Sequence, residues 1–180
     1  MKTSFYTEEE LSKLGLKSYG GDVRISRYAQ IYSPEKISIG DNVRIDDFCI
    51  LSGNIVIGSH IHIAAYCALY GADYGIVMED YTGLSARATI YAAMDDFSGN
   101  YLIGPIHEDC STNITGGLVR ICSCSQIGAG ALIFPDVTVG GGSVLGAMSM
   151  AKQSLEPWSV YAGIPARKIK NRNKRLLDLI

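Results

Sequence analysis

The sequence predicts an all-β protein whose chain winds into a parallel β-helix, a three-sided coil of short strands. Two observations predict this fold: large apolar residues recur at every sixth position over most of the chain, and glycine directly follows several of them. The repeating residues are Ile39, Ile45, Leu51, Ile57, Ile63, Leu69, Met78, Leu84, Ile90, Ile121, Ile127, Ile133, Val139 and Leu145. A period of six fits neither an α-helix, at 3.6 residues per turn, nor a β-hairpin, whose side chains alternate every two residues.

Three sides of about six residues would close one turn, so that every eighteenth residue stacks on its predecessor at roughly 4.8 Å. Ile39 would then lie under Ile57, and Ile127 under Leu145. Glycine accepts the backbone angles of the corners, and it stands there at Gly40, Gly58, Gly128, Gly140 and Gly146. The repeats amount to about five turns, a prism about 25 Å long. We therefore assign residues 23–150 to the coil.

Residues 1–22 are expected to form a cap on the first turn. Thr7 followed by Glu10 is a capping-box pattern, which predicts a short helix through Leu11 and Leu14 that stops at Gly15. Such a cap would cover the open end of the coil, whose edge could otherwise recruit other strands.

Residues 91–118 break the period of six and are expected to form one long inserted loop. Long irregular insertions in compact domains are usually functional or disordered, and this one is rich in aromatic and apolar residues. A second, three-residue slip of the period lies near residues 72–75. The insertion is therefore the first place to look for a site.

Residues 151–180 form a C-terminal extension of the same single domain. Six positive charges lie within nine residues: Arg167, Lys168, Lys170, Arg172, Lys174 and Arg175. We expect the end of this basic, leucine-containing segment to be helical, and its charges either to bind phosphate groups or simply to face solvent.

Composition excludes several classes of protein. The chain has 180 residues, 47% of them hydrophobic and 19% charged, which favours one folded domain over a disordered chain. A net charge of -2 argues against a dedicated nucleic-acid binder. Five cysteines are an odd number, and neither a secretory leader nor an apolar run of ~20 residues is evident, so we expect a cytoplasmic protein without membrane insertion.

The hexad of aliphatic residue, Gly, two variable residues, a small residue and one more resembles the hexapeptide-repeat acyltransferases over residues 25–150. The Gly163–Arg167 turn, the Glu156–Trp158 segment, the Asp95–Asn100 segment and the Ile45–Cys49 segment look like its sugar acetyltransferase branch. That branch includes dTDP-4-amino-4,6-dideoxyglucose acyltransferases and proteins named galactoside acetyltransferase. The resemblance implies a left-handed β-helix, a homotrimer and an acetyl-CoA-dependent acetyltransferase.

The resemblance further implies that acetyl-CoA is a co-substrate held in a groove between two subunits. Small residues would let it approach the backbone of the coil, and the C-terminal cations would bind its phosphates. The corresponding positions are Gly128, Ala129, Gly146, Ala147, Ser149, Pro165, Ala166, Arg167 and Lys168. The alternative for the glycines and alanines is corner geometry alone.

Acyl transfer requires the nucleophile to lose a proton as it attacks the thioester. Many sugar acetyltransferases of the superfamily have His followed by Asp in the insertion, whereas this chain has Asp95 followed by Asp96. Burial between subunits beside Asp96 would raise the pKa of one of the two carboxyls. An amine asks less of a base than a hydroxyl does, so the pair favours N-acylation. His107, in the same insertion, is a third catalytic candidate.

We assign His62, Phe97 and Asn100 to substrate binding and expect no metal. The favoured acceptor is a nucleotide-linked amino sugar, such as dTDP-4-amino-4,6-dideoxyglucose, in the synthesis of a surface polysaccharide such as an O-antigen. The first alternative is O-acetylation of a sugar, a serine or an antibiotic. The more remote ones are a zinc carbonic anhydrase, which would need all three histidines, and a β-helix without catalysis.

Overall fold

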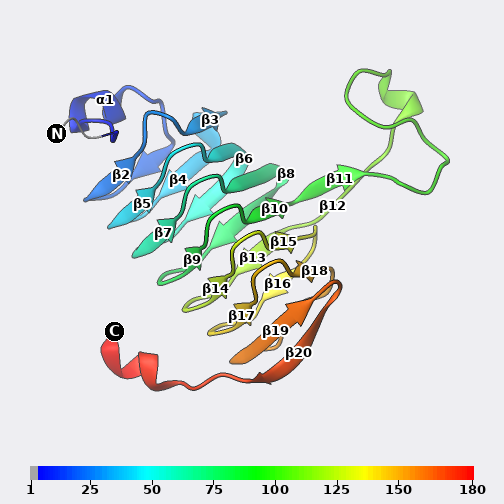
Figure 1. Ribbon diagram of the computed structural model, residues 1–180. Helices are drawn as coiled ribbons and strands as arrows, with labels where there is room; N and C mark the ends of the chain where they lie inside the picture. Colours follow the sequence, from blue (N-terminus) through cyan, green and yellow to red (C-terminus); the bar gives the residue numbers. More distant parts are fainter. Residues whose placement is uncertain (1–3) are drawn as a thin grey trace.

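The computed structural model describes residues 4–180, and it is a three-sided prism of parallel strands with a protruding arm (Figure 1). The first element is α1 (Glu8–Ser12), and Thr7 and Glu10 form the capping box that the sequence predicts. Leu11 of this helix is buried with the core. The predicted short helix is therefore present and ends at Ser12, before Gly15. Residues 1–3 of the predicted cap lie outside the described residues, and Ser18–Tyr19 already pair in parallel with Ser38 and Ile39 of the coil.

Each face of the prism is a wall of stacked strands. Wall 1 contains β2 (Val23–Ile25), β5 (Val43–Ile45), β7 (Ile61–Ile63), β9 (Gly83–Leu84), β14 (Gln126–Ile127), β17 (Val144–Leu145) and β19 (Ser159–Gly163). Wall 2 contains β3 (Gln30–Tyr32), the first parts of β6 (Ile50–Ile57) and β8 (Ala68–Met78), then β10 (Thr89–Tyr91), β15 (Leu132–Ile133) and β18 (Met150–Ala151). Wall 3 contains β1 (Ser18–Tyr19), β4 (Ile37–Ile39), the last parts of β6 and β8, β13 (Val119–Ile121) and β16 (Thr138–Val139).

The register confirms the stacking that the period of six predicts. Ile39 pairs with Ile57, and Ile127 pairs with Leu145. All fourteen repeating apolar residues are buried. Wall 1, however, has seven parallel strands, so the prism has about seven turns and is about 30 Å long, not five turns. The first turn escaped the count because η1 (Pro34–Lys36) lengthens it and shifts the spacing. The last strand, β19, pairs in parallel with β17 and lies beyond residue 150, where the sequence ended the coil.

The corner between walls 2 and 3 carries every interruption of the repeat. Both β6 and β8 bend around this corner as single strands, and Gly53 adopts a φ of 84° there. A Cβ at Gly53 would lie 2.6 Å from the backbone nitrogen of Ala72, so only glycine fits. The long insertion leaves wall 2 after Tyr91 and rejoins wall 3 at Val119, and Met78 pairs directly with Ile121. The insertion therefore leaves the stack of turns intact.

The insertion forms the arm. Its base is a pair of antiparallel strands, β11 (Ala93–Asp95) and β12 (Ile114–Gly116). The segment between them contains η2 (Asp109–Ser111) and stands away from the prism (Figure 1). The base of the arm thus lies against wall 2, whereas its outer part is held by its own contacts.

The C-terminal extension differs in part from the expected helix. Residues after β19 turn back as β20 (Ala166–Asn171), an antiparallel strand on the last edge of wall 1, and only η3 (Arg175–Leu179) is helical, as a 3-10 helix. The open edge of β19 offers hydrogen bonds that a helix would leave unmade. Arg172 then donates to the carbonyl oxygens of Cys124 and Gly142, at 2.8 and 3.0 Å, which holds the tail against the coil. Within residues 4–180, none of the helices has the length and apolar character that crossing a membrane requires.

Candidate active site

Two adjoining hollows lie where the base of the arm meets wall 2. The first, the Phe134 hollow, has a volume of about 400 Å³ and is lined by Tyr91, Ala93, Met94, Asp95, Phe97, Leu132 and Phe134. The second, the Tyr70 hollow, has a volume of about 540 Å³ and is lined by Tyr70, Tyr91, Ala93, Met94, Asp95, Gly104, Pro105, His107, Asp109, Thr112 and Ile114. Asp95 belongs to both. A carboxylate therefore stands at the junction of two cavities large enough for small ligands.

The floor of both hollows comes from one row of outward side chains on wall 2. Each residue of this row directly follows a buried or partly buried aliphatic residue of the wall. In register, the order is Tyr32, Ser52, Tyr70, Tyr91, Phe134 and Lys152. The rings of Tyr70 and Tyr91 are stacked, with centroids 5.0 Å apart. The Lys152 ammonium lies 5.3 Å from the centroid of the Phe134 ring. The β-helix thus builds a continuous strip that passes beneath Asp95.

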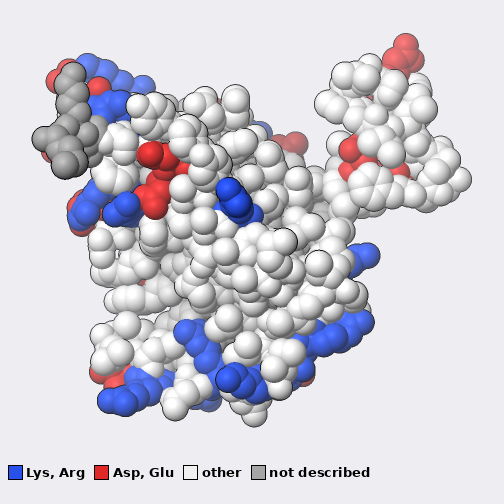
Figure 2. All heavy atoms as spheres, viewed as in Figure 1, with Lys and Arg blue, Asp and Glu red and all other residues white. Residues whose placement is uncertain are grey.

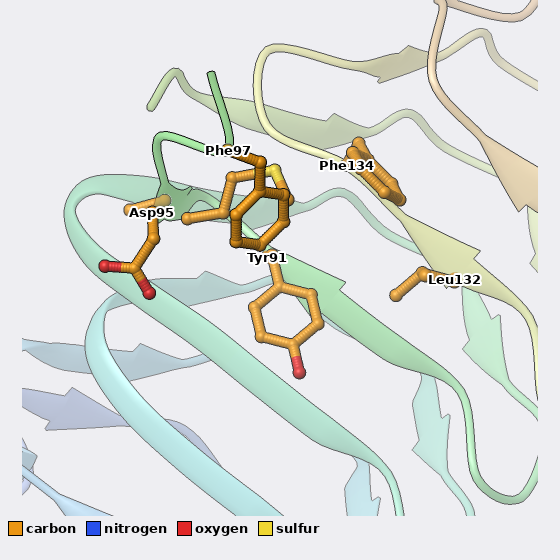
Figure 3. Close-up of a pocket in the computed structure, with 7 residues that line it drawn as sticks. Tyr91, Asp95, Phe97, Leu132 and Phe134 are labelled. Carbon is orange, nitrogen blue, oxygen red and sulfur yellow. The ribbon is translucent and has the colours of Figure 1, made fainter. Parts of the chain in front are cut away.

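Asp95 is the last residue of β11, which fixes its backbone beside wall 2. One carboxylate oxygen accepts a hydrogen bond from the Gly104 N–H at 3.2 Å. Figure 3 shows the carboxylate beside the rings of Tyr91 and Phe97, on the side of the arm that faces the hollows. The side chain is half-buried and no cation pairs with it among residues 4–180. It is free to pair with a positively charged group of a ligand.

Asp96 lies in a different environment from the one that the sequence suggested. Its carboxylate accepts the N–H of Ser98 at 2.7 Å and the side-chain amide of Asn113 at 2.8 Å. The backbone N–H of Ser98, followed by the other hydrogen bonds, holds the pKa of Asp96 below its usual value. Asp96 lines neither hollow. Within a single chain, the two carboxylates therefore bond to different parts of the arm: Asp95 to Gly104, and Asp96 to Ser98 and Asn113.

The other predicted residues of the insertion divide between the two hollows and the solvent. His107 lines the Tyr70 hollow and Phe97 lines the Phe134 hollow, so both share a cavity with Asp95. Asn100 lies on an exposed turn, where its N–H donates to the Ser98 hydroxyl at 3.3 Å, and it lines neither hollow. His107 and Phe97 are thus placed to contact a ligand in these hollows. Within a single chain, Asn100 is not.

His62 is on wall 1, away from the arm. Its Nε2 is 2.8 Å from a carboxylate oxygen of Asp46, and Arg44 also donates to Asp46, at 2.7 Å. His62 and Arg44 line a separate hollow of about 270 Å³. Within a single chain, His62 therefore does not meet Asp95.

The small residues predicted to bind acetyl-CoA lie at the corner between walls 1 and 2. Gly128 and Ala129 follow β14, and Gly146 and Ala147 follow β17 one turn later. A Cβ on Gly128 would lie 2.4 Å from the Ala147 nitrogen, so the stacking of turns already requires glycine there. Ser149 is buried at this corner, where its hydroxyl accepts the Gly163 N–H at 3.0 Å and so supports the β19–β20 hairpin.

A further hollow, the hairpin hollow, has a volume of about 270 Å³ and lies beside the tip of the β19–β20 hairpin. It is lined by Lys152, Gln153, Pro165, Ala166 and Arg167. Neither Lys152 nor Arg167 pairs with a carboxylate among residues 4–180. Lys168, by contrast, pairs with Glu156 at 2.7 Å, and this pairing raises the pKa of Lys168. Figure 2 shows Lys and Arg gathered at this end of the prism.

Sequence reasoning missed Lys152, although the signal was present. Lys152 follows Ala151, which stacks on Ile133, just as Phe134 follows Ile133. Because its ammonium lies over Phe134 and its side chain lines the hairpin hollow, Lys152 lies between that hollow and the Phe134 hollow. A single line along wall 2 therefore runs from Asp95 past Phe134 and Lys152 to Arg167.

Comparisons with known proteins place this geometry in a family, although no protein-family model matches the chain. A dTDP-4-amino-4,6-dideoxy-D-glucose acyltransferase of Escherichia coli is 41% identical over 179 residues, which cover 98% of this chain and 93% of that protein. The galactoside O-acetyltransferase of E. coli strain K12 is 30% identical over 122 residues, covering 66% of this chain and 57% of that protein.

Solved structures give the same result. A variant of AntD, an N-acyltransferase from Bacillus cereus in complex with dTDP-4-amino-4,6-dideoxyglucose and coenzyme A, has a TM-score of 0.97 and 51% identity, covering 99% of this chain and 96% of that one. AntD in complex with dTDP and 3-hydroxybutyryl-CoA has the same TM-score, 52% identity, and coverage of 99% and 95%. These matches support the left-handed form of the β-helix. The chain belongs to the hexapeptide-repeat acyltransferases, in the family that includes dTDP-4-amino-4,6-dideoxy-D-glucose acyltransferase.

Proposed function

We propose that this enzyme transfers an acyl group from acyl-CoA to the amine of a nucleotide-linked amino sugar, with dTDP-4-amino-4,6-dideoxyglucose as the acceptor. The main observation in support of the proposal is the position of Asp95, which lies at the junction of two hollows with different linings. The names of the E. coli relative and of AntD supply the identity of the sugar. Acetyl-CoA is the expected donor.

The Phe134 hollow suits the donor. Its walls are mainly apolar, which fits an acyl group and the thioester end of pantetheine. From there, the line along wall 2 leads to Lys152 and Arg167, whose unpaired charges fit the phosphates of CoA. The small residues at the corner, Gly128 and Gly146 among them, leave the backbone of that edge open to an extended ligand. Lys168 contributes less than the sequence suggested, because Glu156 neutralises it.

The Tyr70 hollow suits the acceptor. Stacked tyrosine rings and Ile114 offer an apolar surface to a deoxygenated sugar, and Asp95 offers a carboxylate to its ammonium group. The reactive form is the neutral amine. Its nitrogen attacks the thioester carbonyl carbon, its proton passes to the Asp95 carboxylate, and the CoA sulfur leaves as the amide forms. His107, in the same hollow, is the other candidate base.

Asp96 is better suited to position the arm than to take part in the reaction. Its hydrogen bonds to Ser98 and Asn113 join the two sides of the arm just beyond β11 and β12. This junction fixes the end of β11, where Asp95 lies. Asp96 therefore acts through the placement of Asp95.

A homotrimer would complete the site. The arm exposes large apolar side chains, including Phe97 at 67%, Ile103 at 55% and Ile106 at 86%. Residues 92–118 contain four acidic residues and neither Lys nor Arg. Exposed apolar surface of this extent is typical of an interface, and a second copy against the arm would also enclose the open hollows. We place the enzyme in the cytoplasm, where acyl-CoA is available.

An acceptor assay tests the proposal. Purified enzyme with acetyl-CoA is offered dTDP-4-amino-4,6-dideoxyglucose or a galactoside, and CoA release and product mass are followed. We expect an N-acetylated nucleotide sugar, and a drop in kcat of about 100-fold or more for Asp95→Asn. Asp47→Asn, a change of the same kind on the coil and away from the arm, is the control for general damage. Faster acetylation of the galactoside, or an Asp95→Asn enzyme with normal turnover, would contradict the proposal.

A further inference from the structure

The last end of the prism combines positive charge with exposed aliphatic side chains. β20 is the final strand on the edge of wall 1, and the residues after it continue across this end of the prism, far from α1 (Figure 1). Residues 164–180 contain six Lys or Arg and one acidic residue, Asp178, although the whole chain has a net charge of -2. Five aliphatic side chains of the same segment are exposed: Ile164, Ile169, Leu177, Leu179 and Ile180. The proposed site uses residues at the tip of the β19–β20 hairpin and leaves the rest of this segment without a role.

Most of these cations have no carboxylate partner. Lys168 pairs with Glu156, and Arg172 donates to backbone carbonyl oxygens of the coil. The other four form no ion pair among residues 4–180: Arg167, Lys170, Lys174 and Arg175. The Lys174 ammonium lies 5.5 Å from the centroid of the Trp158 ring, a contact that does not neutralise its charge. These charges gather on one end of the molecule (Figure 2), where they are available to a negatively charged partner.

The exposed aliphatic side chains narrow the choice of partner. Ile164 is 71% exposed, Ile169 62% and Leu179 81%. Aliphatic surface of this kind is stabilised when a partner removes it from water. Because these side chains are interspersed with the cations, the partner must offer anionic groups and an apolar layer side by side. Nucleic acid offers phosphates without the apolar layer, whereas the surface of an anionic bilayer offers both.

We propose that residues 164–180, the basic end of the prism, dock on the surface of a bilayer that contains anionic lipid. The cations lie among the phosphates of the lipid headgroups, and the side chains of Leu179 and Ile180 enter the boundary with the acyl chains. The docking is peripheral, so no segment spans the bilayer. At the opposite end of the prism, α1 begins with three glutamates, Glu8–Glu10, which an anionic surface repels. The charges therefore orient the prism with α1 away from the lipid.

Vesicle flotation with the full-length protein tests this surface. Vesicles of phosphatidylcholine alone are compared with vesicles that also contain about 30% phosphatidylglycerol, and we expect the protein to float only with the anionic vesicles. Each basic residue near an anionic surface strengthens binding about fivefold, so Lys170→Ala/Arg175→Ala should lower the partition coefficient about 25-fold. Leu179→Ser/Ile180→Ser keeps every charge and should lower it about tenfold or more. High salt should release the wild-type protein, because it screens the charges.

Lys13→Ala/Lys17→Ala is the matched control, because it removes two cations beside α1, at the other end of the prism, and it should float like the wild type. Wild-type protein that does not bind anionic vesicles would refute the docking. Normal flotation of the charge variant would also refute it, and normal flotation of the Leu179→Ser/Ile180→Ser variant would identify a general polyanion-binding surface instead. All variants should acylate the sugar in solution at the wild-type rate, because none of the substituted residues lies in the proposed site. The docking and the proposed function can therefore fail separately.

Discussion

Replacing Lys152 with alanine should weaken the binding of CoA without slowing the chemical step. Lys152 is exposed at the end of wall 2, with its ammonium 5.3 Å from the Phe134 centroid and no carboxylate partner among residues 4–180. A hydrogen bond to a charged group contributes about 1.5 to 3 kcal/mol, but solvent screening at an exposed site reduces that value. The contact with Phe134 is present without CoA, and we expect it to persist when CoA binds, so it largely cancels.

The expected loss is therefore about 1 to 1.4 kcal/mol, which corresponds to a rise of about 5- to 10-fold in the Kd for CoA. Calorimetric titration gives the Kd, and steady-state kinetics should give a similar rise in KM for acetyl-CoA with kcat unchanged. The difference should shrink at high salt, because an exposed charge is screened.

Lys168→Ala is the control, since Glu156 already neutralises Lys168. It removes the same charge from the same end of the prism and should change the Kd by less than about twofold. A second control is acetyl-pantetheine, which lacks the phosphates of CoA and should be used equally well by wild type and Lys152→Ala. The reasoning is refuted if Lys152→Ala binds CoA normally, or if Lys168→Ala loses more affinity than Lys152→Ala does.

Three further expectations concern stability and assembly. Hydrogen bonds lower the pKa of Asp96, so they stabilise the arm fully at pH values above the ordinary carboxyl pKa of 3.8. This stabilisation is lost as the pH falls through the lowered pKa. Hydrogen exchange in the arm should therefore depend on pH in this range, and Asp96→Asn should abolish that dependence. Ile133→Ala empties a fully buried position in the core, so denaturant unfolding should show a loss of about 2 to 5 kcal/mol, whereas Val56→Ala, at an exposed site, should be nearly neutral. Ile106→Ser removes the most exposed apolar side chain of the arm and should weaken the proposed trimer in light scattering; an unchanged assembly would place the interface elsewhere.

The fold was predictable because a single packing rule sets it. A buried residue such as Ile57 must stack on Ile39, and that requirement repeats along the chain at a fixed spacing. The tail was harder to predict, because β20 depends on the free edge of β19, which only the folded coil presents. The basic residues alone do not distinguish a strand on that edge from a helix.

The site was predictable only where the chemistry lies within the insertion. Asp95, His107 and Phe97 stood out in a segment that breaks the repeat, and all three line the hollows. The roles of Asp96 and Lys168 could not be predicted, because their partners depend on the fold. Asn113 is across the arm from Asp96, and Glu156 lies just before β19, the strand that pairs with the strand of Lys168. Lys152 could be recognised as a candidate for CoA binding only from the register of wall 2, which places it beside Phe134.

The central claim is that donor and acceptor meet at Asp95 from opposite directions along wall 2. A crystal structure of the enzyme with CoA and dTDP-4-amino-4,6-dideoxyglucose tests it most directly. The account predicts the sugar amine between the Asp95 carboxylate and the CoA sulfur, with CoA passing Phe134 and Lys152. Binding of CoA along another wall, or a sugar amine out of reach of Asp95, would contradict it.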